Sequence, residues 1–594
     1  MSKRKNSRRA GSGQSPDAQS TAKKSPGHVA HSVDKTLESF TVGALPIINR
    51  ILERMKLSSI LAKYLPADDP RTRISTPRAI LVLVRNILVS REPIYGVGEW
   101  AARHAPELLE LWPKEVPYLN DDRLGRCLDR LFDVTTPDLV MAVVRQVVKE
   151  FDLSLDELHN DSTTVTFCGA YPAAQQEDRL RGRPTHAITW GHNKDHRPDL
   201  KQLLYILTVT EDGGVPIYFS SASGNVVDDQ THQQTWQLLH ELVGQPGFLY
   251  VADCKLATTE NMKYIAGQNG RFVSVLPKTR KEDKEFRQRL RDNPKGVPWQ
   301  HLYDLTDEEG NLRDRLRVCA EEMLSQEGYR VLWFHSTRKA ELDTLARSRR
   351  TQRALAELDQ LRQRLHGPRT RFRERSKVEK ALEEILKKFE VEPWVRVHIE
   401  HQEQATYRQA QRGRPSKKTR YVKRVKTRYT FVWEIDTAQL AQEQTSDGVF
   451  PLITNDREMD AEQLLRAYKR QPLIEKRFSQ FKSDFDVAPV YLHTVSRIQA
   501  LLAVYFFVLL VQTLLERELR QAMVRHEIAS LPMYPEEREC RRPTARRLFD
   551  LFEPVQSHML TLPNGDTEIL VTELSPVQRE ILRLLGIPAN TYGR

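Results

Sequence analysis

The stretch LKQLLYILTVTEDGGVPIYFSS, residues 200–221, decides the fold of this chain. Its two β-branched and aromatic halves flank Asp212-Gly213-Gly214, a combination that predicts a β-hairpin. Similar strand-like runs precede and follow it, and helix-like segments lie between them; the runs are SLDELHNDSTTVTFCG (154–169), GFLYVADC (247–254) and RFVSVLPK (271–278), and the helix-like segments are 228–242 and 258–268. The order strand, hairpin, helix, strand, helix, strand predicts an α/β fold, a mixed sheet flanked by helices.

Outward from this sheet, the chain divides into six segments. Residues 1–33 carry seven Lys/Arg against one Asp and no aromatic residue, which predicts a disordered basic tail. Residues 34–150 have apolar residues at three- and four-residue spacing, which predicts an all-helical domain of DNA-binding size. The remaining segments are a first catalytic part (151–280), an α+β insertion domain (281–450), a second catalytic part (451–525) and a C-terminal segment (526–594) in which Asn564-Gly565 suits a hairpin turn.

The overall composition limits the classes of binding partner. Lys and Arg number 91 against 79 Asp and Glu, a net charge of +12 with pI near 9.3. This excess favours a polyanion, either nucleic acid or an anionic membrane surface. The longest apolar run, Ala500 to Val511, is shorter than the ~20 residues of a membrane span, so we expect no membrane partner. Five scattered cysteines favour the reducing cytoplasm.

Three acidic residues stand where a metal site could form. Cleavage of a DNA phosphodiester needs two divalent ions about 4 Å apart, held by carboxylates on rigid elements. Asp161 lies in a β-branched strand, Asp253 directly follows the strand FLYVA, and Glu475 lies in a helix that Pro472 begins. Taken alone, each of these three acidic residues could also be explained as a turn residue, a helix cap or a partner of a helix dipole.

Four phrases make the chain recognisable: NDSTTVTFCG (160–169), GHNKDHRPDLKQLLYILTVTEDGGVPIYF (191–219), YVADCKLATTENM (250–262) and YKRQPLIEKRFSQFKSD (468–484). With them the chain resembles the DDE transposases of bacterial insertion sequences, in the branch with a Tyr-x2-Arg-x3-Glu-x6-Lys signature. The resemblance implies an RNase H-like catalytic domain, often with an insertion before the Glu helix. Such an insertion suits the 222 residues between Asp253 and Glu475, against 92 between Asp161 and Asp253.

The resemblance also implies a function. Asp161, Asp253 and Glu475 would be catalytic and bind Mg²⁺, with Mn²⁺ as a substitute, as a pair of ions. The enzyme would cut transposon ends and join them to target DNA. Its partner would be double-stranded DNA, on which it would act as a homodimer in the bacterial cytoplasm, associated with the nucleoid.

Around Glu475 the signature can be followed residue by residue. Seven residues turn a helix by about two full turns, so Lys482 is expected on the face of Glu475, where it could meet a phosphate. Tyr468 takes the tyrosine position, which in the family lies near the transposon end. The arginine position falls on Gln471, with Arg470 one residue early, and glutamine cannot form a charged bidentate grip on phosphate.

A basic segment offers further DNA contacts. Between Glu403 and Arg428 there are ten Lys/Arg and one acid, with Tyr407 and Tyr421 interleaved and Tyr429 directly after, which suits a nucleic-acid surface or a solvated charged loop. The candidate DNA-binding residues are Tyr468, Arg470, Lys482, Arg412, Arg414, Lys417 and Lys418. Other acids have local explanations: Asp195 and Asp199 as caps or partners of Arg197, Asp228 and Asp229 at a helix start, and Asp484 and Asp486 near the site.

Three functions remain open at this point. The first is an active transposase. The second is a metal nuclease of the same fold that cuts without joining. The third is a DNA-binding relative with an inactive site that acts as a regulator, which the intact acidic set argues against and Gln471 supports.

Overall fold

The computed structural model describes residues 36–174, 176–307, 309–367, 371–485, 487–488, 490, 492–562 and 566–592. The expected basic tail, Asp486 and the Asn564-Gly565 turn lie outside these residues.

Five strands form the RNase H-like part of a ten-stranded mixed sheet: β2 (Glu157–Phe167), β5 (Lys201–Thr210), β6 (Pro216–Ser223), β7 (Leu249–Ala252) and β8 (Arg271–Val275). They lie in the order β6-β5-β2-β7-β8, with β5 antiparallel to β2 and β6, and β7 and β8 parallel to β2. Helices α7 (His232–Val243) and α8 (Thr259–Gly267) connect them as expected. The α/β prediction is confirmed.

The predicted hairpin between β5 and β6 is also confirmed. Gly213 and Gly214 both have positive φ, 80° and 63°, in the turn of residues 211–214 that connects the strands, and glycine adopts this conformation without strain. Every residue of β5 is buried, because other elements cover both faces of the sheet.

The insertion extends the same sheet. It begins with α9 (Lys281–Asp292), and β8 then pairs with β15 (Val449–Thr454), beyond which the sheet continues through β12 (Arg330–Ser336), β10 (Leu312–Cys319) and β9 (Trp299–Thr306), with β11 (Met323–Leu324) beside β12. A domain boundary at 450/451 therefore falls inside a strand. The pairing of β15 with β8 joins the insertion to the sheet formed by β2, β5, β6, β7 and β8.

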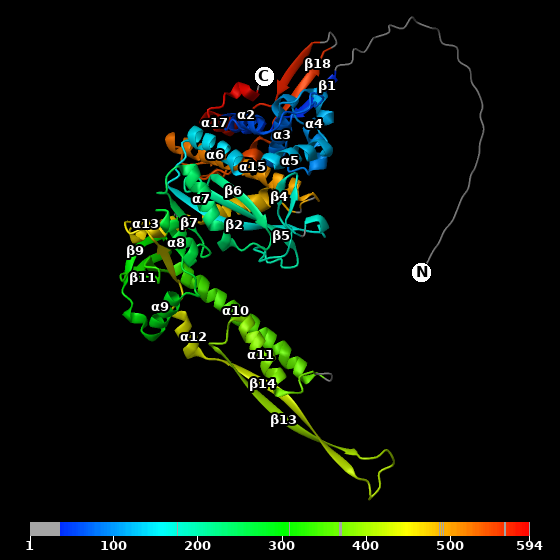
Figure 1. Ribbon diagram of the computed structural model, residues 1–594, viewed down its shortest axis with the longest axis vertical. Coiled ribbons are helices and arrows are strands. Elements are labelled where there is room, and N and C mark those ends of the chain that lie inside the picture. Colours follow the sequence, from blue (N-terminus) through cyan, green and yellow to red (C-terminus); the bar gives the residue numbers. More distant parts are fainter. Residues whose placement is uncertain are drawn as a thin grey trace, which may run out of the picture.

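A separate arm projects from this extension (Figure 1). It consists of α10 (Thr337–His366), α11 (Arg375–Phe389) and a two-stranded ribbon, β13 (Val395–Gln409) and β14 (Tyr421–Ile435), followed by α12 (Thr437–Gln444). Its own apolar cluster joins the helices to the root of the ribbon, with Leu358, Leu382, Trp394 and Phe431 at its centre.

The apolar helix α15 (Val495–Arg525) is the axis of the remaining body. It packs on β6 and is surrounded by α1 (Leu45–Arg54), α3 (Thr76–Val89), α5 (Asp121–Val134), α16 (Ala545–Phe552) and α17 (Pro576–Leu584). It is long and apolar enough to cross a membrane, but 89% of its most apolar window is buried inside the structure. It is a core helix, as the sequence suggests.

The two ends of the chain form one body with this helix. The N-terminal segment is helical, with α2 (Leu57–Tyr64), α4 (Val97–Ala102) and α6 (Pro137–Phe151) completing it, except for β1 (Thr36–Thr41). This strand pairs with β18 (Gln556–Thr561), which continues to β19 (Thr567–Val571). Short pairs β3 (Asp178–Leu180) with β4 (Arg183–Thr185), and β16 (Leu531–Pro532) with β17 (Glu539–Cys540), complete the strands.

The segment 460–525 is divided into several helices. The chain forms α13 (Ala461–Lys469), α14 (Pro472–Ser479) and a π-helical turn (Gln480–Asp484), and α15 begins only at Val495. Pro472 supplies no backbone N–H, so α14 begins there as a new helix.

Candidate active site

Asp161 and Asp253 lie side by side at the edge of the sheet. In the parallel pairing of β2 with β7, Asn160 is opposite Ala252, and each aspartate is the next residue. Neighbouring strands are about 4.8 Å apart, so the two carboxylates share one neighbourhood. Burial, together with the charge of Asp253, raises the pKa of Asp161 to about 6, while Lys194 opposes this shift. Burial also raises the pKa of Asp253.

Lys194 is the cation at this pair of carboxylates. Its Nζ lies 3.2 Å from Asp161 Oδ1 and 3.0 Å from Asp228 Oδ2, and it donates to the carbonyl oxygen (2.7 Å) and Oγ (2.8 Å) of Ser162. Burial opposes its charge, but Asp161 and Asp228 outweigh this effect and raise the pKa of Lys194. The sequence reasoning missed this role, although Lys194 lies in the most specific phrase, GHNKDHRPDLKQ.

Asp228 belongs to the same group. It begins the 3₁₀ turn Asp228–Thr231 that leads into α7, which agrees with its expected place at a helix start. Its Oδ1 also accepts a hydrogen bond from Ser162 Oγ at 2.8 Å. A third carboxylate thus stands beside Asp161, reached from a different element.

Glu475 occupies the rim of the site. It lies in the first turn of α14 and is exposed. Its charge acts on Tyr468: burial first, then the charges of Asp253, Glu475 and Asp161 among others, raise the pKa of that phenol to about 12. Tyr468 is therefore within electrostatic reach of all three predicted carboxylates. Within the described residues, no three His, Cys, Asp or Glu side chains converge closely enough to hold an ion.

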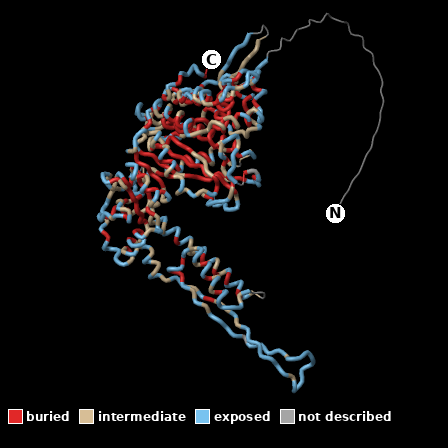
Figure 2. The backbone as a smooth tube through the Cα atoms, in the orientation of Figure 1, coloured by how far each residue is buried: buried red, intermediate tan, exposed pale blue. Residues whose placement is uncertain are grey.

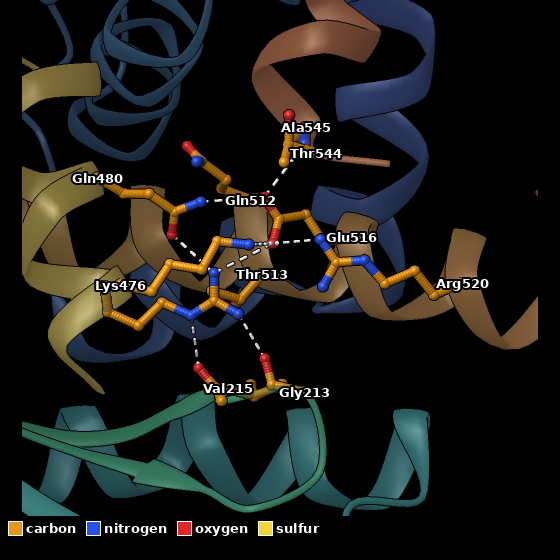
Figure 3. Close-up of polar contacts among 12 residues, drawn as sticks. Gly213, Val215, Lys476, Gln480, Gln512, Thr513, Glu516, Arg520, Thr544 and Ala545 are labelled. Atoms are coloured by element: carbon orange, nitrogen blue, oxygen red, sulfur yellow. Dashed lines mark hydrogen bonds and ion pairs between the residues drawn. The ribbon is translucent and has the colours of Figure 1, made fainter. Parts of the chain in front are cut away.

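A buried ionic network fixes the rotation of α14 (Figure 3). Arg477, which is 1% exposed, donates to Glu516 of α15 at 3.1 Å and to Gln480 at 2.7 Å. Its other nitrogens donate to the carbonyl oxygens of Gly213 and Gly214, in the turn between β5 and β6. The helix is thereby attached to both α15 and the sheet.

Glu516 lies at the centre of the network and forms ion pairs with several cations. Lys476 Nζ lies 3.5 Å and Arg520 Nη2 lies 3.2 Å from its Oε2. Burial opposes the charge of Glu516, but Arg477, Lys476 and Arg520 outweigh it and lower its pKa. Because Lys476 and Arg477 point to α15, the preceding residue Glu475 stays on the exposed side of α14.

Gln471, at the arginine position of the signature, is a buried structural contact. Its Oε1 lies 3.0 Å from His159 Nδ1, and its Nε2 donates to the carbonyl oxygen of Asn160 at 3.2 Å. It therefore joins the start of α14 to β2 at the residue before Asp161.

Arg470 is also held by ion pairs within the protein. It forms a two-pronged ion pair with Glu157 and lies 3.3 Å from Glu211. Glu157 also contacts His159 Nε2 at 2.8 Å. In the described structure Arg470 thus neutralises Glu157 at the start of β2, four residues before Asp161, and Glu211 in the β5–β6 turn.

Lys482 lies in the π-helical turn and forms an ion pair with Asp195. The wider turn changes the angle per residue, so the α-helical argument for a face shared with Glu475 does not apply. Asp195 also accepts from Thr164 Oγ1 at 3.3 Å, and it is the neighbour of Lys194. The contact closes the 192–199 loop over β2. Asp199 pairs with Arg197 as expected, and Asp484 accepts from Gln512 at 3.3 Å.

The remaining predicted DNA contacts lie far from the carboxylates. The four cations Arg412, Arg414, Lys417 and Lys418 stand in the turn at the end of the β13–β14 ribbon (Figure 1), and all are exposed. The structure therefore separates the predicted set into a site at the sheet edge and a distant basic tip.

Comparisons with known proteins give few relatives. Residues 37–145 match a family described as a domain of unknown function, DUF4277. No sequence among curated proteins matches significantly. Two similar solved structures are a piggyBac transposase synaptic complex with hairpin DNA (8% identity, TM-score 0.32, covering 86% of this chain and 78% of that chain) and a Mos1 mariner paired-end complex with Mn (12%, 0.13, 39% and 66%). TM-scores this low do not support a functional assignment. The proposed function therefore rests on the residues of the site.

Proposed function

We propose that the chain is a DDE-type DNA transposase that cuts transposon ends and joins them to target DNA with divalent metal ions. The observation that carries the proposal is the placement of Asp161, inside β2, beside Asp253, directly after the end of the parallel strand β7, with α14 holding Glu475 at the rim. The resemblance of four separate phrases around these residues supports the same reaction.

The donor set fits Mg²⁺. Asp161, Asp253 and Glu475 offer hard carboxylate oxygens, which Mg²⁺ prefers and Mn²⁺ accepts. When bound, two such ions supply activation of the attacking oxygen and stabilisation of the leaving oxygen. The buried pair Asp161 and Asp253, unfavourable without a cation, supplies a reason to bind one.

The protein residues prepare this site. Lys194 neutralises Asp161 and Asp228 and keeps their carboxylates together. Gln471 and Arg477 hold the Glu475 helix against β2 and the β5–β6 turn. Tyr468, and Lys482 once released from Asp195, would contact the DNA end, and Arg412, Arg414, Lys417 and Lys418 would contact DNA further away. Arg470 would contribute by fixing β2, since Glu157 occupies it.

The proposal includes the partners and place of the reaction. Two ends must be brought together for joining, so we propose a homodimer on double-stranded DNA, in the bacterial cytoplasm and on the nucleoid. The helical segment that matches DUF4277 would bind the transposon ends.

The second candidate is a DNA-binding relative without strand transfer. The exposed position of Glu475 and the loss of the signature arginine at Gln471 favour it. A metal nuclease is intermediate between a transposase and a DNA-binding regulator, because it requires the carboxylates for cleavage but does not join DNA.

One assay separates these functions. Purified protein is incubated with Mg²⁺ and with DNA that carries the inverted repeats flanking the gene. A transposase gives joined products, a nuclease gives cuts alone, and a regulator gives a shifted band alone. Asp161→Asn should abolish joining and keep end binding; joining at the wild-type level by this variant would overturn the site assignment.

A further inference from the structure

The β13–β14 ribbon is unusually long and regular. All 15 residue pairs, from Val395↔Ile435 to Gln409↔Tyr421, follow one register without a bulge. At about 3.4 Å per residue the ribbon is about 50 Å long. Its root packs on α10 and α11 through Phe431 and Trp394. Its outer half extends beyond these helices and is exposed (Figures 1 and 2).

The outer half carries much of the charge of the molecule. Residues 403–428 hold ten Lys/Arg against one Glu, a net charge of +9, while the whole chain has +12. All ten cations are exposed, and none forms an ion pair with a described residue. On the nearby helices, several cations are paired, as Lys388 is with Glu357 and Arg375 is with Glu379.

The pairing register divides the ribbon into two unlike faces. Residues opposite one another share a face, and successive residues alternate. One face, here called the basic face, carries Arg408, Arg424, Lys426 and Arg428. The other carries one cation, Lys423, together with Tyr407, Tyr421 and Val425, which are 67%, 52% and 48% exposed; the basic face also includes Val422, opposite Arg408.

We propose that the basic face binds the phosphates of double-stranded DNA, whatever the base sequence, and that the ribbon holds DNA outside the active site. This inference rests on the proposed function, because it names how the same enzyme grips its substrate. Arg424, Lys426 and Arg428 lie on one strand at intervals of about 7 Å, so together they can follow a line of phosphates.

The shape and stability of the ribbon support this partner. A two-stranded ribbon fits the major groove, which is about 12 Å wide. An isolated two-stranded ribbon is marginally stable in water, so a polyanion along the basic face would also stabilise its outer half. Unpaired exposed cations on a regular strand suit phosphate contacts rather than a folded protein partner.

The test measures DNA affinity of the full chain against salt concentration. The basic-face variant is Arg424→Gln/Lys426→Gln/Arg428→Gln, and the control is Lys263→Gln/Lys284→Gln/Lys295→Gln, which removes the same charge from exposed positions outside the ribbon and outside the helical segment 34–150. Each is titrated with short duplexes of three unrelated sequences and with the corresponding single strands. Circular dichroism and thermal melting establish that both variants fold.

The basic-face variant should bind every duplex at least tenfold more weakly, and the slope of log K against log salt should fall by about 2.7, or about 0.9 per lost contact. The control should keep its slope. An unchanged slope, an equal loss in the control, or a greater loss on single strands than on duplexes would overturn the inference. Because binding is measured without cleavage, a protein that binds in this way but does not join DNA would refute the proposed function and not the ribbon.

Discussion

At the level of single residues, the charge of Asp161 that would bind a metal ion is unfavourable in the metal-free protein. Buried beside Asp253, it is an unfavourable anion, and its pKa rises to about 6. Lys194 relieves part of that cost, as a divalent ion would relieve more of it. A carboxylate that serves a metal is thus a destabilising group in the metal-free protein.

This makes the stability of the protein depend on pH through Asp161. Because the folded pKa, about 6, is above the ordinary value of 3.8, ionisation of Asp161 opposes folding above about pH 6 and costs nothing below about pH 4. Asp161→Asn removes the cost. In urea unfolding with EDTA, the stability of the variant relative to wild type should rise between these pH values by up to about 3 kcal/mol. A difference that stays constant with pH would contradict this account.

Lys194→Met tests the neutralising role. Without this ammonium, Asp161 and Asp228 are left without their cation, so the metal-free variant should melt at a lower temperature than wild type. A bound ion restores the missing charge, so Mg²⁺ should raise its melting temperature more than it raises that of the wild type. Lys255→Met, an exposed lysine two residues after Asp253, is the matched control. An equal Mg²⁺ effect in all three proteins would refute the role.

At the level of elements, α14 is held by charges that water does not reach. Removing one partner of a buried ion pair typically costs about 3–5 kcal/mol, because the other charge remains buried. Arg477→Met should therefore lower the free energy of unfolding by that amount, measured by urea denaturation. Arg466→Met breaks the exposed pair with Glu462 on α13 and should cost less than about 1 kcal/mol. Equal effects of the two changes would mean that the network does not stabilise the helix.

The elements also show what the sequence can predict. Strands β2, β5, β6, β7 and β8 follow from local β-branched patterns and from Gly213-Gly214, since those signals are local. Asp253 follows from the end of β7, whereas Asp161 lies inside β2. Lys194, however, reaches the site from a loop, and Gln471 meets His159 across 312 positions of sequence. Such contacts depend on tertiary packing, which periodicity does not encode. Likewise β1 has its partner in β18, more than 500 residues later.

On the scale of the whole molecule, the first and last described segments are in contact. Tyr592 donates a hydrogen bond to the carbonyl oxygen of Gly43 at 3.1 Å, and its ring packs beside Phe552. Tyr592→Ala should lower the free energy of unfolding by about 3 kcal/mol, because it removes a buried aromatic side chain. Thr591→Ala, at an exposed neighbour, should leave it nearly unchanged. If thermal melting shows no difference between these variants, the two ends do not stabilise one body.

The molecule thus places the proposed active site and the proposed DNA-binding ribbon in separate regions. Asp161 and Asp253 lie at the end of β7 beside β2, and the basic ribbon lies at the end of a projecting arm (Figure 1). A long DNA duplex could contact both regions, whereas a short one could not. The account therefore depends most on whether the three acids act as one site.

The most direct test is strand joining by Asp161→Asn, Asp253→Asn and Glu475→Gln, with Asp199→Asn as the exposed control, in Mg²⁺ and with DNA bearing the transposon ends. Residues of one catalytic unit are strongly non-additive. Each single variant should lose joining by about 10³-fold or more, the double variant Asp161→Asn/Glu475→Gln should lose no more than the single ones, and the control should keep it. Near-normal joining by Glu475→Gln, or losses that multiply in the double variant, would contradict the single site.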